Sequence, residues 1–154
     1  MIQFVNLTPH EINIVDVARV PSHGVVRVRE IVREDVSRQL SEHFRVPLVA
    51  KEFDVPEGVT IEWCGEKPVL DKSRPVFVIV SFPVAQDPHV VGEVIERVAV
   101  DLGFGVHDGP IFVVAPDTGP ESAVRDEQGR IVGVRRLFVP RHEVREMMRA
   151  QRKQ

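Results

Sequence analysis

The sequence predicts an α+β fold: a mixed, mostly antiparallel sheet or partly closed β-barrel with one central helix and a C-terminal helix. Three observations support this prediction. Short runs of β-branched residues dominate the chain before Asp87, a helical period follows, and charged residues at helical spacing end the chain. With 154 residues, 43% of them apolar, we expect a single domain over 1–154, in which 140–154 is a basic C-terminal helix.

The first strands surround a turn. "IQFVN" and "EINIV" flank Thr8-Pro9-His10, where proline lacks a backbone donor, so a hairpin or a bent strand is expected. Further on, Val26 and Val28 alternate with Arg27 and Arg29. This alternation predicts a strand with a basic outward face.

One short helix and one buried strand follow. Residues 35–44 have Val36, Leu40 and Phe44 at helical spacing, with Asp35 as the expected N-cap. The run "RPVFVIVSFPV" is almost continuously apolar. Such a run is typical of a buried central strand.

The central helix is expected after Asp87-Pro88. Val90, Val94, Val98 and Leu102 form one stripe, which ends near Gly103. A hairpin is expected next, because Asp126-Glu127-Gln128-Gly129 separates two β-type runs.

Charge is unevenly distributed. Residues 135–154 carry seven basic and two acidic side chains, a net charge of +5. Since the whole chain has a net charge of -3, the rest of the chain has a net charge of -8. Such a helix is most simply a solvated face, with Val144, Met147 and Met148 as its apolar stripe. The alternatives are an anion, a nucleic acid or an acidic surface of another subunit.

A cytoplasmic protein is expected. The single cysteine, Cys64, excludes an intramolecular disulfide and is expected to be a packed thiol. No apolar run reaches the roughly 18 residues of a membrane span, and the N-terminus has no basic leader.

Catalytic motifs are missing from the sequence: there is no GxSxG, P-loop, GxGxxG or HExxH pattern. The six histidines are scattered, so neither a metal site nor a cofactor is predicted. An enzyme therefore remains the minor alternative, a hydrolase that uses Asp117 or Asp108 as base, His107 or His10 as acid and Arg125 as anion stabiliser. The Asp-Thr-Gly tripeptide also occurs in aspartic proteases, but these need two such carboxylates.

A turn with arginines nearby is the main candidate site. Asp117, Thr118 and Gly119 follow a buried strand, and an Asx-type turn there would expose backbone N–H groups. Arg125, Arg135 and Arg136 lie on the hairpin that follows. Their guanidinium groups would suit phosphate or carboxylate. The alternative is that Arg125 pairs with Asp126 or Glu127, while Arg135 and Arg136 protect an edge strand.

Four stretches resemble one family. "VNLTPHEINIV", "PSHGVVRV", "VFVIVSFPVA" and "VVAPDTGPESAVRDEQGRIVGVRRL" are similar to motifs of small, uncharacterised proteins found in phages, prophages and bacterial genomes. The resemblance implies a phage-type accessory protein. Asn6 and His10 belong to its first motif and join the candidate ligand-binding residues. His23 interrupts the Pro-Ser-Gly pattern of the family, and residues 87–109 form a longer, helix-bearing insertion. If this insertion caps the turn, ligand access would differ from that in shorter relatives.

Three functional classes follow. The first is a protein that binds a small anionic, nucleotide-like ligand without catalysis and so sequesters an immune signal. The second is an interaction module that assembles through its basic C-terminal helix. The third is the hydrolase described above. A homo-oligomer is expected, whereas a membrane or nucleic acid is not expected as a partner.

Overall fold

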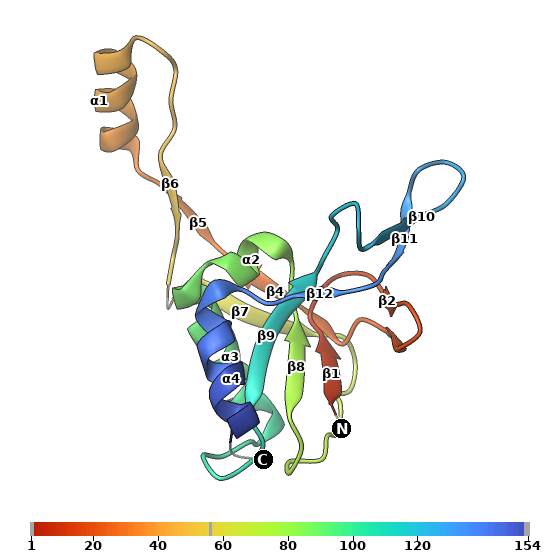
Figure 1. Ribbon diagram of the computed structural model, residues 1–154. Helices are drawn as coiled ribbons and strands as arrows, with labels where there is room; N and C mark the ends of the chain where they lie inside the picture. The colour runs from red at the N-terminus through yellow and green to blue at the C-terminus, as the bar shows by residue number, and fades with distance from the viewer. Residues whose placement is uncertain (1, 56, 153–154) are drawn as a thin grey trace.

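The computed structural model describes residues 2–55 and 57–152 and is built around a four-stranded central sheet (Figure 1). The first three strands of its order β1-β8-β9-β12 run parallel, and the last pairs antiparallel. The register places Val78 between Val5 and Val113. The four strands are β1 (Gln3–Asn6), β8 (Val76–Ile79), β9 (Ile111–Pro116) and β12 (Leu137–Phe138).

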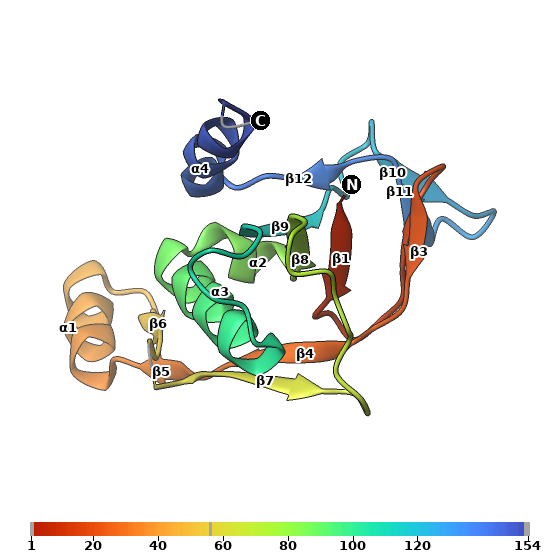
Figure 2. The same cartoon turned by 90° about the horizontal axis from the view of Figure 1, so that it is seen from below.

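Helices α2 (Phe82–Gln86) and α3 (Pro88–Leu102) cover one face of this sheet. Outside α3 lies a ribbon of β4 (Gly24–Val28) paired antiparallel with β7 (Val59–Trp63), so α3 is held between sheet and ribbon (Figure 2). This layer is the larger core. Its fully buried side chains include Val5, Val59, Val76, Val78, Val90, Val94, Val98 and Val113.

The opposite face packs against helix α4 (Arg141–Arg152) and strands β2 (Ile12–Ile14) and β3 (Ala18–Val20). Its aromatic residues Phe4, Phe77 and Phe112 stack edge to face along the sheet, with centroid separations of 6.2 and 6.1 Å. The buried residues of this smaller core are Ile14, Val20, Ile79 and Val114.

A buried carboxylate attaches α4 to the sheet. Glu143 is only 4% exposed, and its Oε1 accepts a hydrogen bond of 2.7 Å from the Val113 N–H of β9. The Val113 amide lies on the edge of β9 that is not paired with β8. Burial raises the pKa of Glu143 above its usual value.

A second sheet, of order β10-β11-β2-β3, joins the smaller core through β2. Strand β11 (Ile131–Val134) pairs parallel with β2 and antiparallel with β10 (Ala123–Arg125). The β10–β11 hairpin extends away from the central sheet (Figure 1).

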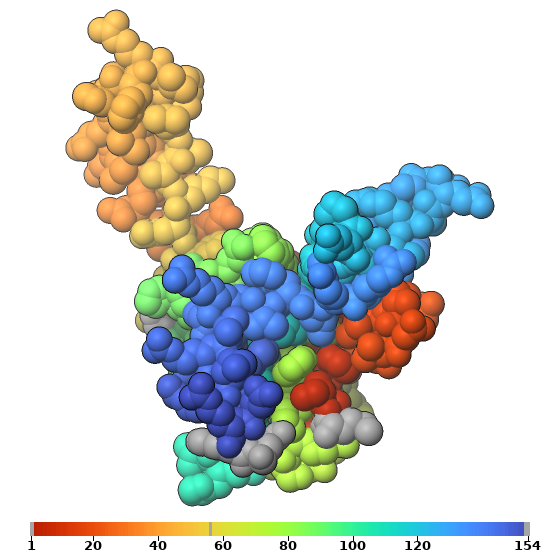
Figure 3. All heavy atoms as spheres, viewed as in Figure 1, coloured from red at the N-terminus to blue at the C-terminus, as the bar shows by residue number. Residues whose placement is uncertain are grey.

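A second projection, which we call the arm, comprises residues 30–53. Strands β5 (Glu30–Val32) and β6 (Lys51–Phe53) form an antiparallel ribbon, and α1 (Glu34–Phe44) stands at its far end. The arm stands clear of the rest of the molecule (Figure 3).

The predicted α+β class is confirmed. The described strands form mixed and antiparallel sheets that remain open, so they do not close into a barrel. Strand β8 is the buried central strand, as predicted, and the β10–β11 hairpin also forms. Among the described residues, no helix is both long and apolar enough to cross a membrane.

Helix α3 begins and ends where the sequence indicates. The Asp87 side chain accepts hydrogen bonds from His89 N at 3.0 Å and Val90 N at 3.2 Å. Gly103 ends the helix with a left-handed φ of 74°. Helix α1 matches the short helix expected over residues 35–44, and α2 is a further helix beside the central and C-terminal ones.

Two local predictions are wrong. The segments around Thr8-Pro9-His10 are not paired with each other, because β1 joins β8 and β2 joins β3 and β11. Asp35 does not cap α1. The helix begins at Glu34 after Arg33, and the Asp35 carboxylate instead pairs with Arg38 at 2.9 Å.

Several predictions of burial are also wrong. Phe44 is 61% exposed and Leu40 is 38% exposed, because α1 lies in the arm. Cys64 is exposed as well. In α4 the residue that is buried is Glu143, while Val144 and Met148, two of the three predicted stripe residues, are exposed and Met147 packs on the smaller core. Lys153 and Gln154, the end of the predicted basic helix, lie outside the described residues.

Candidate functional site

Three segments that are distant in sequence line one groove beside the second sheet. The groove has a volume of about 290 Å³. It lies between the segment that begins β2, the turn after β9 and strand β11, which are neighbours in Figure 1. Its lining residues are His10, Glu11, Ile12, Asn13, Pro116, Thr118, Ile131, Val132, Gly133 and Val134.

Asn6 supports the first of these segments from below. The residue is fully buried, and its Nδ2 donates to the carbonyl oxygens of His10 at 2.8 Å and Val20 at 3.0 Å. Its Oδ1 accepts from both the backbone N–H and the hydroxyl of Thr8, at 2.9 and 2.6 Å. Asn6 therefore has no polar atom left for a ligand, although the sequence predicts it as a binding residue.

His23 and Ser22 fix the same loop. The Nδ1 of His23 accepts a bond of 2.9 Å from Asn6 N, and the Ser22 hydroxyl donates to Thr8 O at 2.6 Å. Burial lowers the pKa of His23, which favours the neutral ring that this bond requires. His10 follows the loop, and its exposed side chain lines the groove.

Asp117 forms the predicted turn after β9. Its Oδ1 accepts from Gly119 N at 3.0 Å, which is the geometry of an Asx turn. Its Oδ2 accepts from Arg136 through Nε at 3.1 Å and Nη2 at 3.0 Å. Pro116 and Thr118, on either side of Asp117, line the groove, whereas Asp117 and Arg136 do not.

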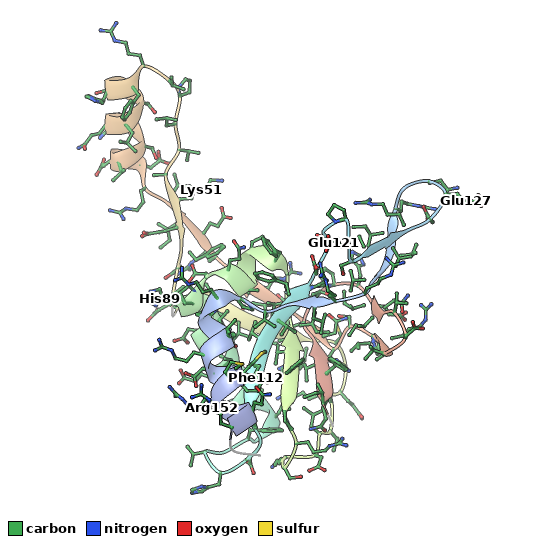
Figure 4. All side chains as sticks on the ribbon, viewed as in Figure 1. Lys51, His89, Phe112, Glu121, Glu127 and Arg152 are labelled. Atoms are coloured by element: carbon green, nitrogen blue, oxygen red, sulfur yellow. The ribbon has the colours of Figure 1, made fainter. Side chains whose placement is uncertain are left out.

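Arg136 is consequently oriented by acidic residues. Its Nη2 also lies 3.6 Å from the Glu121 carboxylate, which Figure 4 shows on the loop before β10. The Arg136 side chain remains 57% exposed. The contacts to Asp117 and Glu121 use Nε and Nη2 of this guanidinium.

Ser122 completes the turn and has no signal in the sequence. It is fully buried, and its hydroxyl oxygen accepts from the backbone N–H groups of Arg135 at 3.1 Å and Arg136 at 2.9 Å. A serine between a turn and a strand is ordinary in sequence. Its role becomes visible only when the return strand is in place.

The three predicted arginines do not converge. Arg125 donates from Nη1 to the carbonyl of Gly129 at 2.6 Å, within the hairpin loop. Arg130, rather than Arg125, pairs with Asp126, at 3.1 Å. Arg135 is exposed at the end of β11. Of these three arginines, Arg136 is the one that pairs with Asp117, the residue between the lining residues Pro116 and Thr118.

The lining of the groove is chiefly apolar. Its polar groups are the His10 ring, the Thr118 hydroxyl, the Asn13 amide and the Glu11 carboxylate. The last two have partners, because Asn13 donates to Val132 O at 3.2 Å and Glu11 pairs with Arg19 at 3.2 Å. Such a lining suits a flat apolar group with few polar atoms.

The two alternative hydrolytic bases lie at opposite ends of β9. Asp108 precedes the strand and Asp117 follows it, so about 20 Å of strand separates these two carboxylates. The Asp108 carboxylate accepts from Gly105 N at 2.6 Å. Within residues 2–55 and 57–152, no three His, Cys, Asp or Glu side chains gather as a metal site.

The insertion 87–109 does not cap the turn. Helix α3 packs on the face of the central sheet that also contacts β4 and β7, whereas β2 packs on the opposite face. The β10–β11 hairpin is the element beside the groove.

Comparison with models of known families, with curated proteins and with solved structures gave no match for this chain.

Proposed function

We propose that the protein binds a small nucleotide-like ligand in the groove between β2, β11 and the turn after β9. The observation that carries this proposal is the convergence of His10, Thr118 and Gly133 on one groove. These residues belong to the N-terminal motif, the Asp-Thr-Gly turn and the return strand, which together carry the resemblance to phage-type proteins.

The ligand chemistry follows from the lining. The apolar walls of Ile12, Ile131 and Val134 would hold a planar ring such as a nucleobase. The anionic part of the ligand would extend from Thr118 toward Arg136, whose guanidinium pairs with the neighbouring Asp117 and is 57% exposed. His10 and Thr118 would supply further hydrogen bonds. In a phage-type accessory protein this binding would sequester a signal without converting it.

The framework around the groove supports a preformed site. Asn6, Asp117 and Ser122 use their side chains to fix backbone segments rather than to face the groove. A rigid site loses less conformational entropy on binding. Catalysis is not needed for such a role, and the Asp117 carboxylate is already engaged by Arg136.

Native mass spectrometry of the purified full chain, followed by chromatography of released small molecules, tests the proposal. ADP-ribose and cyclic dinucleotides are then titrated as probes. We expect one of these probes to bind and to be recovered intact. Arg136→Ala should weaken binding about 10- to 100-fold, as expected for a lost charged hydrogen bond, and Thr118→Ala about 3- to 10-fold, as for a neutral one.

Matched controls separate this site from others. Arg125→Ala and His107→Ala remove an arginine and a histidine that do not line the groove, so they should bind like the wild type. If no probe binds the wild type and no small molecule is released, the proposal is wrong. Turnover of a bound probe would instead indicate an enzyme.

A second candidate function is assembly through α4. Four arginines, Arg141, Arg145, Arg149 and Arg152, are exposed along this helix together with Val144 and Met148. A hollow of about 610 Å³ lies between α4 and the start of α3. This basic and partly apolar surface would suit an acidic protein partner.

A further inference from the structure

The arm has apolar side chains but almost no core of its own. Of its described side chains only Ser37 is buried. The arm is instead closed by serine hydroxyls: Ser37 Oγ accepts from Ala50 N at 2.8 Å, and Ser41 Oγ accepts from Leu48 N at 2.9 Å. Hydrogen bonds thus fix the segment that returns from α1, and the apolar groups remain outside.

Neither the helix nor the ribbon of the arm is expected to be stable in isolation. A helix of 11 residues is marginal in water unless a tertiary contact buries one side. A two-stranded ribbon is also marginal, and β5–β6 pairs with no further strand among the described residues. A contact that covers the arm would therefore stabilise both elements.

The arm exposes seven large apolar side chains. Their exposed fractions amount to roughly 600 Å² in total, compared with the ~800 Å² that each partner buries in a standard interface. Ile31 and Val32 are consecutive in β5, so their side chains lie on opposite faces of the ribbon. The other five, which we call the arm patch, are Leu40, Phe44, Val46, Leu48 and Val49, each between 38 and 61% exposed.

We propose that a second copy of this chain covers the arm patch, so that two arms pack against each other around a two-fold axis. Such an interface requires a surface that complements itself. The arm offers both halves: Phe44 is 61% exposed, and next along the chain lies a shallow, open surface formed by Ser41, Glu42, Arg45, Val46, Pro47 and Leu48. The Phe44 ring of each copy then packs on this surface of the other.

The charges of the arm fit a second copy better than an oppositely charged partner. Residues 30–53 have four basic and five acidic side chains, a net charge of -1. Several already pair within the arm: Arg33 with Glu52 at 3.4 Å, Lys51 with Glu30 at 3.6 Å and Arg38 with Asp35 at 2.9 Å. Figure 4 shows Lys51 on the ribbon of the arm. Two such arms do not repel each other strongly.

Sedimentation equilibrium of the full chain between about 1 and 100 μM tests this proposal, a range that covers micromolar dimers. The wild type should have twice the monomer mass of 17.4 kDa. Phe44→Asp should raise the dimer dissociation constant about 100-fold or more, as for a central hot spot. Val49 lies outside α1, so Val49→Asp should also raise the dimer dissociation constant. This variant distinguishes loss of the interface from local unfolding of the helix.

Two further variants identify the interface. Val106→Asp changes a residue that is 95% exposed outside the arm and should leave the dimer intact. Met148→Asp changes α4. A wild type that remains monomeric at 100 μM, or a dimer that Met148→Asp disrupts and both arm variants do not, overturns the proposal. Because the groove lies on the other side of the molecule (Figure 1), neither result affects the proposed ligand site.

Discussion

Replacement of Asn6 by alanine should destabilise the fold strongly. The substitution removes four hydrogen bonds and leaves two buried groups, the Thr8 N–H and the Val20 carbonyl, without the partner that Asn6 supplies. Each unpartnered buried group costs ~1–3 kcal/mol, so Asn6→Ala should lower the free energy of unfolding by about 4 kcal/mol. In a chain of this size that is a decrease of about 8–16 °C in melting temperature.

Urea unfolding provides the assay, because the single tryptophan, Trp63, is half-buried and donates to Asp101 at 2.8 Å. Its fluorescence should report loss of the larger core. Protein concentration is held fixed, since a dimer would make the midpoint depend on concentration. The midpoint should fall while the slope stays unchanged.

Two comparison variants make the result specific. Asn6→Asp keeps the acceptor for Thr8 but places an oxygen against two carbonyls, so it should be at least as destabilising as alanine. Asn13→Ala removes one exposed bond, to Val132 O, and should cost about 1 kcal/mol or less. If Asn6→Ala also unfolds within about 1 kcal/mol of the wild type, the framework role of Asn6 is refuted.

Three further outcomes are expected. Glu143→Gln keeps an acceptor for Val113 N but removes the titratable group. Since the folded pKa of Glu143 is raised, the stability of the wild type should fall as pH rises from about 4.5 through that raised value. The variant should lose this pH dependence in urea titrations at several pH values. His23 has the opposite sign: its folded pKa is lowered, so its contribution is present above the unfolded value near 6.5 and is lost as pH falls, and His23→Gln should flatten this acid limb. Gly109→Ala should destabilise by several kcal/mol, because its Cβ would lie 2.3 Å from the Arg74 carbonyl oxygen; an unchanged melting temperature would contradict the close packing there.

The elements that could be predicted are those with strong local signals. Asp87-Pro88 and Gly103 mark the ends of α3 because capping depends on adjacent residues. The hairpin turn depends on Gly129, whose φ is 80°. The apolar run of β8 predicts a central strand because both of its faces are buried.

The elements that were mispredicted depend on distant partners. Helical spacing shows that Leu40 and Phe44 share a face of α1, but not whether any other element covers that face. The burial of Glu143 likewise depends on an unpaired edge of β9, thirty residues earlier in the chain. No local pattern distinguishes such a glutamate from an exposed one.

The candidate site was predicted in part. The Asx turn at Asp117 could be predicted from four residues, and His10 and Thr118 do share a groove. Which of the arginines lies next to the Asp117 turn could not be predicted, because alternation along β11 does not reveal that Asp117 pairs with Arg136. Asn6 is the opposite case: it was predicted to bind a ligand because it is a polar residue in a motif, but its side chain instead stabilises the fold.

The hydrogen bond between Glu143 and the Val113 amide also bears on aggregation. Strand β12 pairs with β9 only at Pro116 and Ala115, so the earlier part of β9 is shielded by α4 rather than by a neighbouring strand. An unpaired strand edge is a template for another chain. The C-terminal helix therefore protects the protein from aggregation. A chain that ends before Arg141 would expose the unpaired edge of β9 to other chains.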